Sequence, residues 1–385
     1  MSRRPHPAPG VDRPASLHRR GWLLHAAIGS AAAALPATWL AAAPAATAAP
    51  AARTPPATGV IAVPYYNTEL LLQMQRRHWY LPQAAAFSRA TRQLLAVLTS
   101  QCPIPGWTAA RPAWIEAMAA WSRLNAVAVG PLLQRRSARA IDFQPPRPRL
   151  IDQALAALRT EAAPLPPDAE RLARIGSPAK GLPALELLLW HPAYARADAT
   201  LCAYATGLAG ELWREAQALE AAWLAEDQAE PDADALAQAY TEFVNQWLGA
   251  VEALRWRDIE RPLLAGPADK TGYPRQLSGQ TALAWRSHWE AVRTLTLAPA
   301  QAPAQGAGLV PMSLYLLGQG HIGLSAKLDG SVRQADAALR QLGPREPKSR
   351  QLAASHALAQ LKHLIETDAA SAAQVHIGFS DADGD

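Results

Sequence analysis

One short apolar segment holds the residues best suited to chemistry. Glu186 is the only charged residue between positions 182 and 192, and His191 follows it five residues later. A carboxylate buried without a partner is strongly unfavourable, so Glu186 must be paired or used. Carboxylate and imidazole groups are reasonable ligands for iron or zinc. The alternative is a buried hydrogen bond or an Arg pair for Glu186, and this is the favoured interpretation.

The spacing of these two residues decides between the alternatives only in part. Five residues correspond to about 500° of rotation around an α-helix, so Glu186 and His191 do not share one stripe. They can meet only if the helix ends at Trp190. Metal ligation by Glu186 and His191 is therefore kept as the less favoured hypothesis.

Two further groups of polar residues stand on predicted helices. His363 and Glu366 form an H-x-x-E pair, but their neighbours are polar, which indicates a solvated helix face. Ser278 stands where a helix is predicted to begin and is expected to cap it. His288 lies between two Trp residues and is expected either to pack at the edge of the core or to line a cleft between domains.

The sequence contains no established catalytic signature. It has no H-E-x-x-H zinc pair, no G-x-S-x-G nucleophile turn and no glycine-rich phosphate loop. The residues alone therefore give no basis for assigning an enzymatic reaction.

Helices must position these residues. Half of the 385 residues are hydrophobic and runs of β-branched residues are scarce, which predicts an all-α fold. Apolar residues recur at helical spacing in separate stretches of the chain. The predicted helices span residues 65–100, 112–129, 151–160, 168–175, 199–225, 234–259, 278–297, 310–342 and 349–368. Pro82 is expected to kink or split the first of them. Residues 310–342 are expected to form one helix or two, with a break around Gly318 and Gly320 or at Asp329 and Gly330.

An acidic stretch containing a proline, residues 227–234, is the best candidate for a domain boundary. About four substantial helices are predicted on each side of it. The fold expected is therefore two tandem helical-bundle domains, an N-terminal bundle over 61–228 and a C-terminal bundle over 229–385.

Residues 1–49 have the pattern of an export signal. Arg19 and Arg20 precede an apolar, Ala-rich run that ends in small residues, which is typical of a Sec or twin-arginine signal. Residues 50–60 read as a flexible Ala/Pro linker. No later stretch is long and apolar enough to span a bilayer, so a periplasmic location is expected, without a transmembrane span in the mature chain. Without the signal the net charge of +5 falls to about +1, which argues against nucleic-acid binding.

The chain has two cysteines, Cys102 and Cys202. Two cysteines in an exported protein most often pair, so a disulfide between them is expected, with two free buried thiols as the alternative. The bridge would close a loop of about 100 residues and stabilise the fold by on the order of 4 kcal/mol.

The segment from Gly181 to Trp190 resembles the G-x-H-x-x-E segment of the imelysin-like family. Gly181 and Glu186 match, but Pro183 stands at the family's His position. Weaker matches run from Trp121 to Pro148 in the family's order of Trp, Arg, Gly-Pro, Arg and Pro. The last residues, 375–385, also resemble the Gly-Phe and Asp-Gly-Asp ending of such chains.

The resemblance implies a function that the residues alone do not. Imelysin-like proteins are exported, all-helical, two-domain proteins associated with iron acquisition, first classed as metallopeptidases, with a site between the domains. It implies a periplasmic binding or accessory protein linked to iron or another divalent cation, with iron-acquisition proteins of the periplasm or membrane as partners. The alternatives are a metallopeptidase, disfavoured because Pro183 removes the motif His, and a structural or protein-interaction module. The residues implied at the interdomain site are Gly181, Pro183, Trp190, Ser278 and His288.

Overall fold

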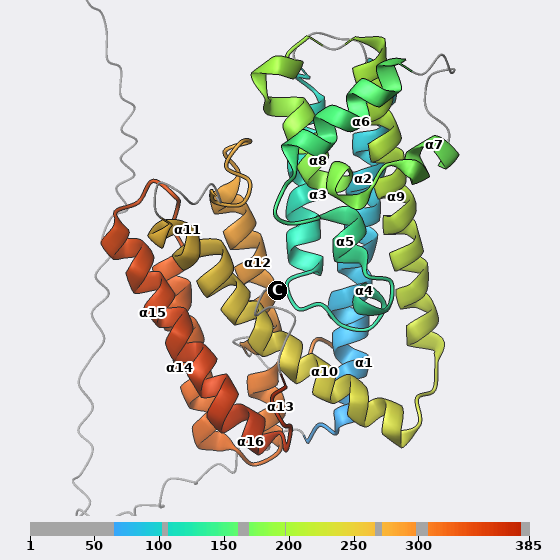
Figure 1. Cartoon of the computed structure of the whole chain (residues 1–385). Helices are drawn as coiled ribbons and strands as arrows, with labels where there is room; N and C mark the ends of the chain where they lie inside the picture. Colours follow the sequence, from blue (N-terminus) through green and yellow to red (C-terminus); the bar gives the residue numbers. More distant parts are fainter. Residues whose placement is uncertain are drawn as a thin grey trace, which may run out of the picture. The chain divides into compact units, whose positions relative to one another are not determined.

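The computed structural model of the chain describes residues 65–101, 107–160, 169–196, 198–265, 272–297 and 307–378. The expected export signal, the linker and the end residues 379–385 lie outside these ranges. Every regular element in the described part is a helix, and no strand occurs there (Figure 1). The all-α prediction is confirmed.

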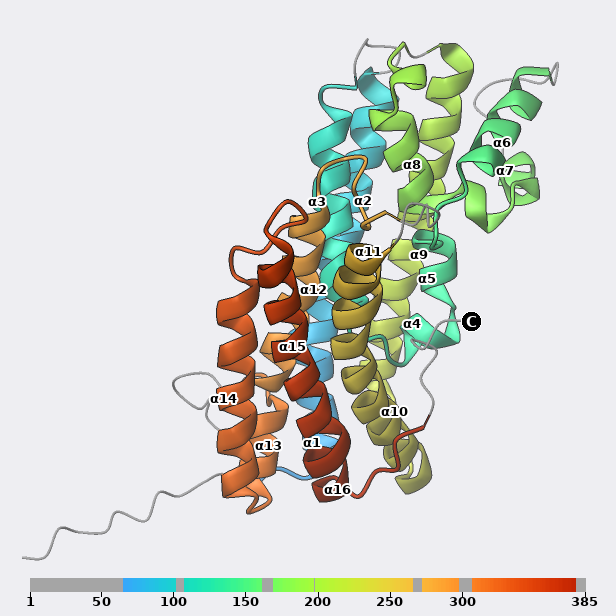
Figure 2. The same ribbon diagram turned by 60° about the vertical axis from the view of Figure 1, so that its left-hand side comes forward.

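Three long helices organise the described part of the first half: α2 (Leu81–Gln101), α3 (Ala110–Leu124) and α9 (Ala199–Gln228), preceded by the short α1 (Thr68–Gln75). Helix α2 packs along both α3 and α9 (Figure 2). Large apolar side chains of these three helices belong to the hydrophobic core. The shorter elements of this half are α4 (Pro131–Gln134), α5 (Ser137–Ile141), α6 (Pro148–Thr160), α7 (Ala169–Arg174), η2 (Ser177–Ala179), α8 (Gly181–Trp190) and η3 (Pro192–Tyr194).

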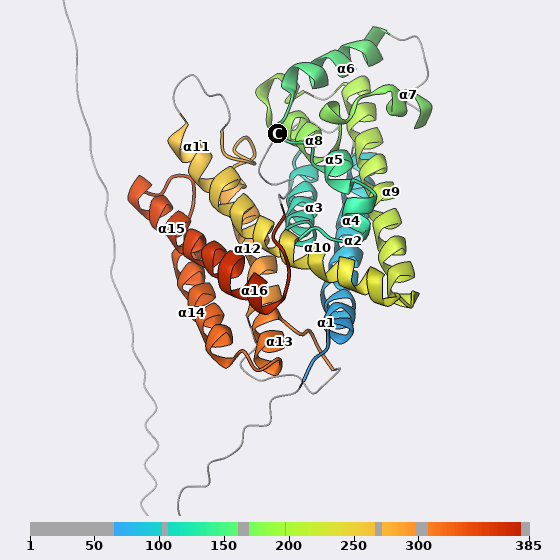
Figure 3. The same cartoon turned by 60° about the horizontal axis from the view of Figure 1, so that its bottom comes forward.

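The second half is built on α10 (Ala233–Glu252), α12 (Thr281–Thr296), α14 (Ile322–Leu339) and α15 (Lys348–Leu364). Helix α15 packs against both α14 and α10, while α12 packs against α3 of the first half (Figure 3). The contact between α12 and α3 joins the two halves. The shorter elements are α11 (Arg261–Leu264), α13 (Met312–Gly318) and α16 (Ala370–Ala372).

In the described ranges, three helices contain a π-helical turn: η1 (Arg76–Tyr80), η4 (Ala253–Glu260) and η5 (Ile365–Ala369). The long helix predicted over 65–100 is therefore divided by η1. Pro82 follows this turn, in the first turn of α2, where its missing N–H group is tolerated. Of the two breaks considered within residues 310–342, the one around Gly318 and Gly320 separates α13 from α14, whereas α14 continues through Asp329 and Gly330.

The predicted boundary falls in the loop between α9 and α10. Asp232 ends this loop as the N-cap of α10, and its carboxylate accepts a hydrogen bond from the Ala235 N–H group at 2.8 Å. By their contacts, residues 61–385 group into one unit. The division into two domains at residue 228 stays a prediction.

The cysteine pairing also stays a prediction. Cys202 is buried in α9 and is not a free thiol, but Cys102 lies outside the described residues. Separately, none of the helices in the described ranges is long and apolar enough to cross a membrane.

Candidate functional site

Helix α8 is buried in the interior of the protein and contains Glu186. All of its residues except the last are buried, and Glu186 itself is only 5% exposed. This burial follows from the sequence, since a helix that is apolar on every side must be covered on every side. Pro183 occupies the first turn, where the backbone N–H groups have no partner within the helix. The sequence thus forms a helix although a proline stands inside it.

Gly181 fixes where α8 begins. Its φ angle is +69°, and a Cβ atom added there would lie 2.2 Å from the carbonyl oxygen of Ile141. No residue with a side chain fits this close approach between two backbones. The start of α8 is thereby held against the end of α5, directly beside Asp142.

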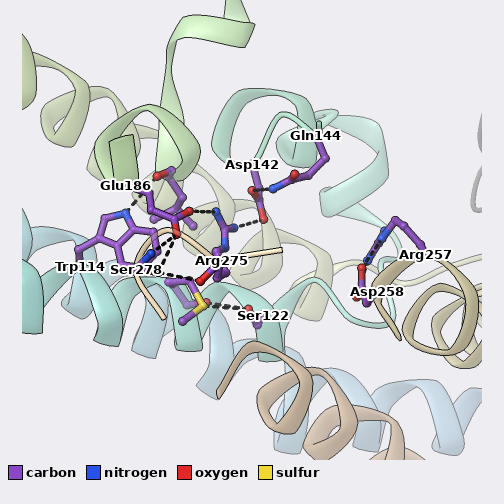
Figure 4. Close-up of polar contacts among 11 residues, drawn as sticks. Trp114, Ser122, Asp142, Gln144, Glu186, Arg257, Asp258, Arg275 and Ser278 are labelled. Atoms are coloured by element: carbon purple, nitrogen blue, oxygen red, sulfur yellow. Dashed lines mark hydrogen bonds and ion pairs between the residues drawn. The ribbon is translucent and has the colours of Figure 1, made fainter. Parts of the chain in front are cut away.

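The Glu186 carboxylate is paired with a loop of the second half (Figure 4). Its Oε1 atom accepts hydrogen bonds from the backbone N–H of Ser278 at 2.9 Å and from the Ser278 hydroxyl at 2.6 Å. Its Oε2 atom lies 3.6 Å from Nη1 of Arg275. The favoured interpretation of Glu186, a buried hydrogen bond and Arg pair, is what the structure has.

The expectation that Ser278 caps the following helix is wrong. Helix α12 begins at Thr281, and its N-cap is Gln280, whose side chain makes no capping hydrogen bond. The Ser278 hydroxyl is directed at Glu186 instead and also lies 3.1 Å from the carbonyl oxygen of Arg275. As a cap, the Ser278 oxygen would accept a hydrogen bond from a backbone N–H group. Here its hydroxyl donates a charge-assisted hydrogen bond to the buried carboxylate, and the helix begins only at Thr281.

Arg275 lies between two carboxylates. It forms an ion pair with Asp142 as well as with Glu186, and its side chain is 3% exposed. Burial by itself lowers the pKa of Arg275, but the negative charges of Asp142 and Glu186 outweigh burial, and the net pKa is raised. The guanidinium group is therefore a permanent cation.

Aromatic rings close the other sides of this cluster. The Arg275 guanidinium lies over the Trp114 ring, 5.6 Å from its centroid. The Trp114 indole donates to the carbonyl oxygen of Leu182 in α8 at 3.1 Å, which fixes the ring. Trp190 packs edge-on against Trp114 with their centroids 4.9 Å apart. Trp190 thus belongs to the surroundings of the site.

His191 does not face Glu186. It is exposed at the end of α8, where its Nδ1 atom accepts a hydrogen bond from the Ala193 N–H at 3.3 Å and its ring contacts Tyr194. Here the imidazole caps the short helix η3.

His288 belongs to the core of the second half. Its Nε2 atom lies 2.8 Å from the carbonyl oxygen of Ala250, so this nitrogen must carry the proton. Burial lowers the pKa of His288, the nearby Asp258 opposes that shift, and Arg257 adds to it. The predicted site residues Ser278 and Glu186 are in contact, whereas His288 serves a separate buried contact.

The residues around Glu186 do not fit a divalent cation. Oε1 is taken by two Ser278 donors, Arg275 stands between the carboxylates, and Pro183 offers no nitrogen ligand. Across the described ranges, no three His, Cys, Asp or Glu residues are grouped so that they could hold a metal ion. Ligation by Glu186 and His191 stays a prediction that this geometry does not favour.

A reactive serine is also a poor description of the site. A serine bonded to a carboxylate resembles an activated nucleophile. However, Ser278 is 8% exposed and Arg275 offsets the charge on Glu186 that would draw off its proton. The arrangement instead holds the first and second halves together through the buried contacts of Glu186 with Ser278 and Arg275.

Sequence reasoning missed Arg275 and Asp142 as members of this cluster. The only signal was the unpaired charge of Glu186, which requires a cation without indicating which one. Arg275 has a φ of +58° in an irregular turn, and Asp142 follows a five-residue helix. Neither position has a periodicity that a sequence pattern would show.

Comparison with known proteins agrees with the fold. The imelysin (peptidase M75) family model matches residues 79–375. Among solved structures, an imelysin-like protein from Psychrobacter arcticum aligns with a TM-score of 0.68 at 20% identity, covering 83% of this chain and 100% of that one.

A second solved structure is more distant. It is named as an iron-regulated protein A precursor from Parabacteroides distasonis, with a TM-score of 0.58 at 12% identity over 77% of this chain and 93% of that one. No curated protein matches the sequence. At these identities the two structures show the similarity of fold alone.

Proposed function

This chain belongs to the imelysin family, and from that premise we propose that it is an exported, periplasmic accessory protein of iron acquisition that carries out no peptidase reaction. One observation carries the non-catalytic part. Glu186, the carboxylate of the family segment, is engaged by Ser278 and Arg275 and is not open to a metal ion and water.

A metallopeptidase needs a metal that holds a water molecule and a general base that activates it. Position 183 is Pro, which supplies no ligand, and Glu186 already accepts two hydrogen bonds. A carboxylate in that state cannot take a proton from water without losing its partners. The peptidase alternative is therefore disfavoured by the chemistry of these side chains.

The iron-linked and periplasmic parts of the proposal have other support. One protein of the same fold is named as iron-regulated and as a precursor. The first 49 residues of this chain have the pattern of an export signal. Iron-acquisition proteins of the periplasm or membrane are the partners that such a location offers.

The experiment is growth of a deletion strain under iron limitation, complemented with the wild-type chain, with Glu186→Gln or with the control His191→Ala. All three are expected to restore growth and to fractionate with the periplasm, with Glu186→Gln showing a lower melting temperature. Purified protein is expected to leave casein and a mixed peptide library uncleaved. Cleavage lost in Glu186→Gln but kept in His191→Ala would contradict the non-catalytic part, and a deletion without an iron phenotype would contradict the iron-linked part.

A further inference from the structure

We infer that Arg275 is a built-in cation, whose guanidinium stands between Glu186 and Asp142 where a metal-dependent junction would place a metal ion. The junction between the two halves is then independent of metal. This inference concerns the chemistry of the cluster and does not rest on the proposed role in iron acquisition.

The negative charges of Glu186 and Asp142 must be offset within the protein. Glu186 comes from α8 and Asp142 follows α5, and the backbone contact at Gly181 holds these two elements together. Their side chains are only 7% and 18% exposed. Two carboxylates so close to the same point repel each other in a poorly solvated interior, so a cation between them is required.

Arg275 reaches both carboxylates at once. Its Nη1 atom lies 3.6 Å from Oε2 of Glu186, and its Nη2 atom pairs with Oδ2 of Asp142. A guanidinium presents several N–H donors in a fixed plane, which suits two separate oxygen atoms better than a lysine ammonium does. Gln144 donates to the other oxygen of Asp142 at 2.8 Å and fixes its orientation.

Arg275 lies in a turn whose backbone hydrogen bonding involves its own carbonyl group. Arg275 has a φ of +58°, a conformation that non-glycine residues adopt only when their surroundings enforce it. Its carbonyl oxygen accepts a hydrogen bond from the Gln280 N–H at 3.0 Å, and the Ser278 hydroxyl oxygen lies 3.1 Å from it. The same turn therefore supplies the cation and both Ser278 donors to Glu186.

The shape of the enclosure also suits a guanidinium. Trp114 covers one face of the Arg275 group, 5.6 Å from ring centroid to the central carbon. An aromatic face stabilises a flat organic cation, whereas a hydrated divalent ion needs oxygen or nitrogen ligands in that direction. Because the pKa of Arg275 is raised, its charge persists throughout the physiological pH range.

Removing Arg275 should convert the junction into one that responds to cations. Without its side chain, the Glu186 and Asp142 carboxylates are left facing the place of the guanidinium, and the Ser278 hydroxyl stays on Glu186. All three groups offer oxygen ligands. Mn²⁺ and Ca²⁺ prefer such ligands. A divalent ion could then replace the charge that the protein normally provides.

Thermal unfolding of the full chain with EDTA, with millimolar MnCl₂ and with millimolar CaCl₂ tests this inference. The melting temperature of the wild type should be the same in all three. Arg275→Ala should melt several degrees lower, and Mn²⁺ or Ca²⁺ should restore part of the loss. Arg350→Ala, which removes an exposed arginine of a surface ion pair, is the control and should show neither effect.

A second variant keeps the test decisive if Arg275→Ala unfolds. The triple variant Glu186→Gln/Asp142→Asn/Arg275→Ala removes the two negative charges together with the cation and should melt above Arg275→Ala or fold where it does not. A wild-type melting temperature that falls in EDTA overturns the inference. So does an Arg275→Ala protein that neither the ions nor the neutral side chains restore.

Discussion

Glu186 and Ser278 are 92 residues apart in the sequence, yet the carboxylate of one accepts both the backbone N–H and the hydroxyl of the other, at 2.9 and 2.6 Å. This relationship ties α8 of the first half to the turn before α12 of the second. Arg275 then offsets the charge of Glu186. The segment that resembles a metal motif is thereby explained as a structural junction.

Replacing Glu186 with Gln should destabilise the protein by about 1–3 kcal/mol, the range for a buried hydrogen bond that loses its charged partner. Gln keeps the size of the side chain but leaves Arg275 with Asp142 as its remaining counter-charge. Urea unfolding measures the loss. Glu366→Gln, on an exposed helix face, is the control and should change stability little; equal stabilities of the two variants would refute the pairing.

Gly181→Ala should lower the free energy of unfolding by more than Gly320→Ala. Both glycines have a positive φ, +69° and +89°, so each substitution carries the left-handed penalty of roughly 1–2 kcal/mol. Only at Gly181 does the new Cβ also meet a backbone oxygen, at 2.2 Å, whereas nothing lies within 4 Å at Gly320. Urea unfolding of both variants gives the comparison, and a smaller loss for Gly181→Ala would be evidence against the close approach.

His288 should make stability depend on pH. Its pKa is lowered in the folded protein from the ordinary 6.5, so below about pH 6.5 the unfolded chain binds the extra proton first. This contribution is therefore present above the unfolded-state pKa and is lost as the pH falls toward the folded-state pKa. Stability measured from about pH 7.5 down to about pH 5 should fall less steeply in His288→Gln than in the wild type. Parallel slopes would show that burial does not lower the pKa of His288.

If Cys102 and Cys202 form the expected disulfide, unreduced protein contains no alkylatable thiol. The bridge would stabilise the fold by on the order of 4 kcal/mol through loop closure, so Cys202→Ser should melt at a lower temperature. Mass spectrometry after alkylation without a reductant is the measurement. Alkylation of both Cys102 and Cys202 would show that the bridge is absent.

Most of the fold could be predicted from the sequence because helical periodicity is a local property. The helices around Trp114, Trp247 and Leu358 follow directly from apolar stripes, and these side chains are fully buried. The π-helical turn η1 was not predictable, since the pattern from residue 65 to 100 is that of one helix. Pro82 is expected from the sequence to kink or split this helix, whereas the irregularity is the π-helical turn η1, which ends just before α2.

The site was predictable only in part. The burial of Glu186 and its need for a partner followed from its apolar neighbours, and Ser278 was singled out, although for capping. That Arg275 would be the partner could not be inferred, because its position depends on a strained turn and on how α3 and α12 pack. Long-range pairing of this kind is decided by tertiary structure.

The most direct test of the account is the metal content of the full chain, purified from the periplasm without chelators and measured by inductively coupled plasma mass spectrometry. The account predicts far less than one iron, zinc or manganese per chain, with no difference between wild type and Glu186→Gln. One metal per chain in the wild type that is lost in Glu186→Gln would contradict it.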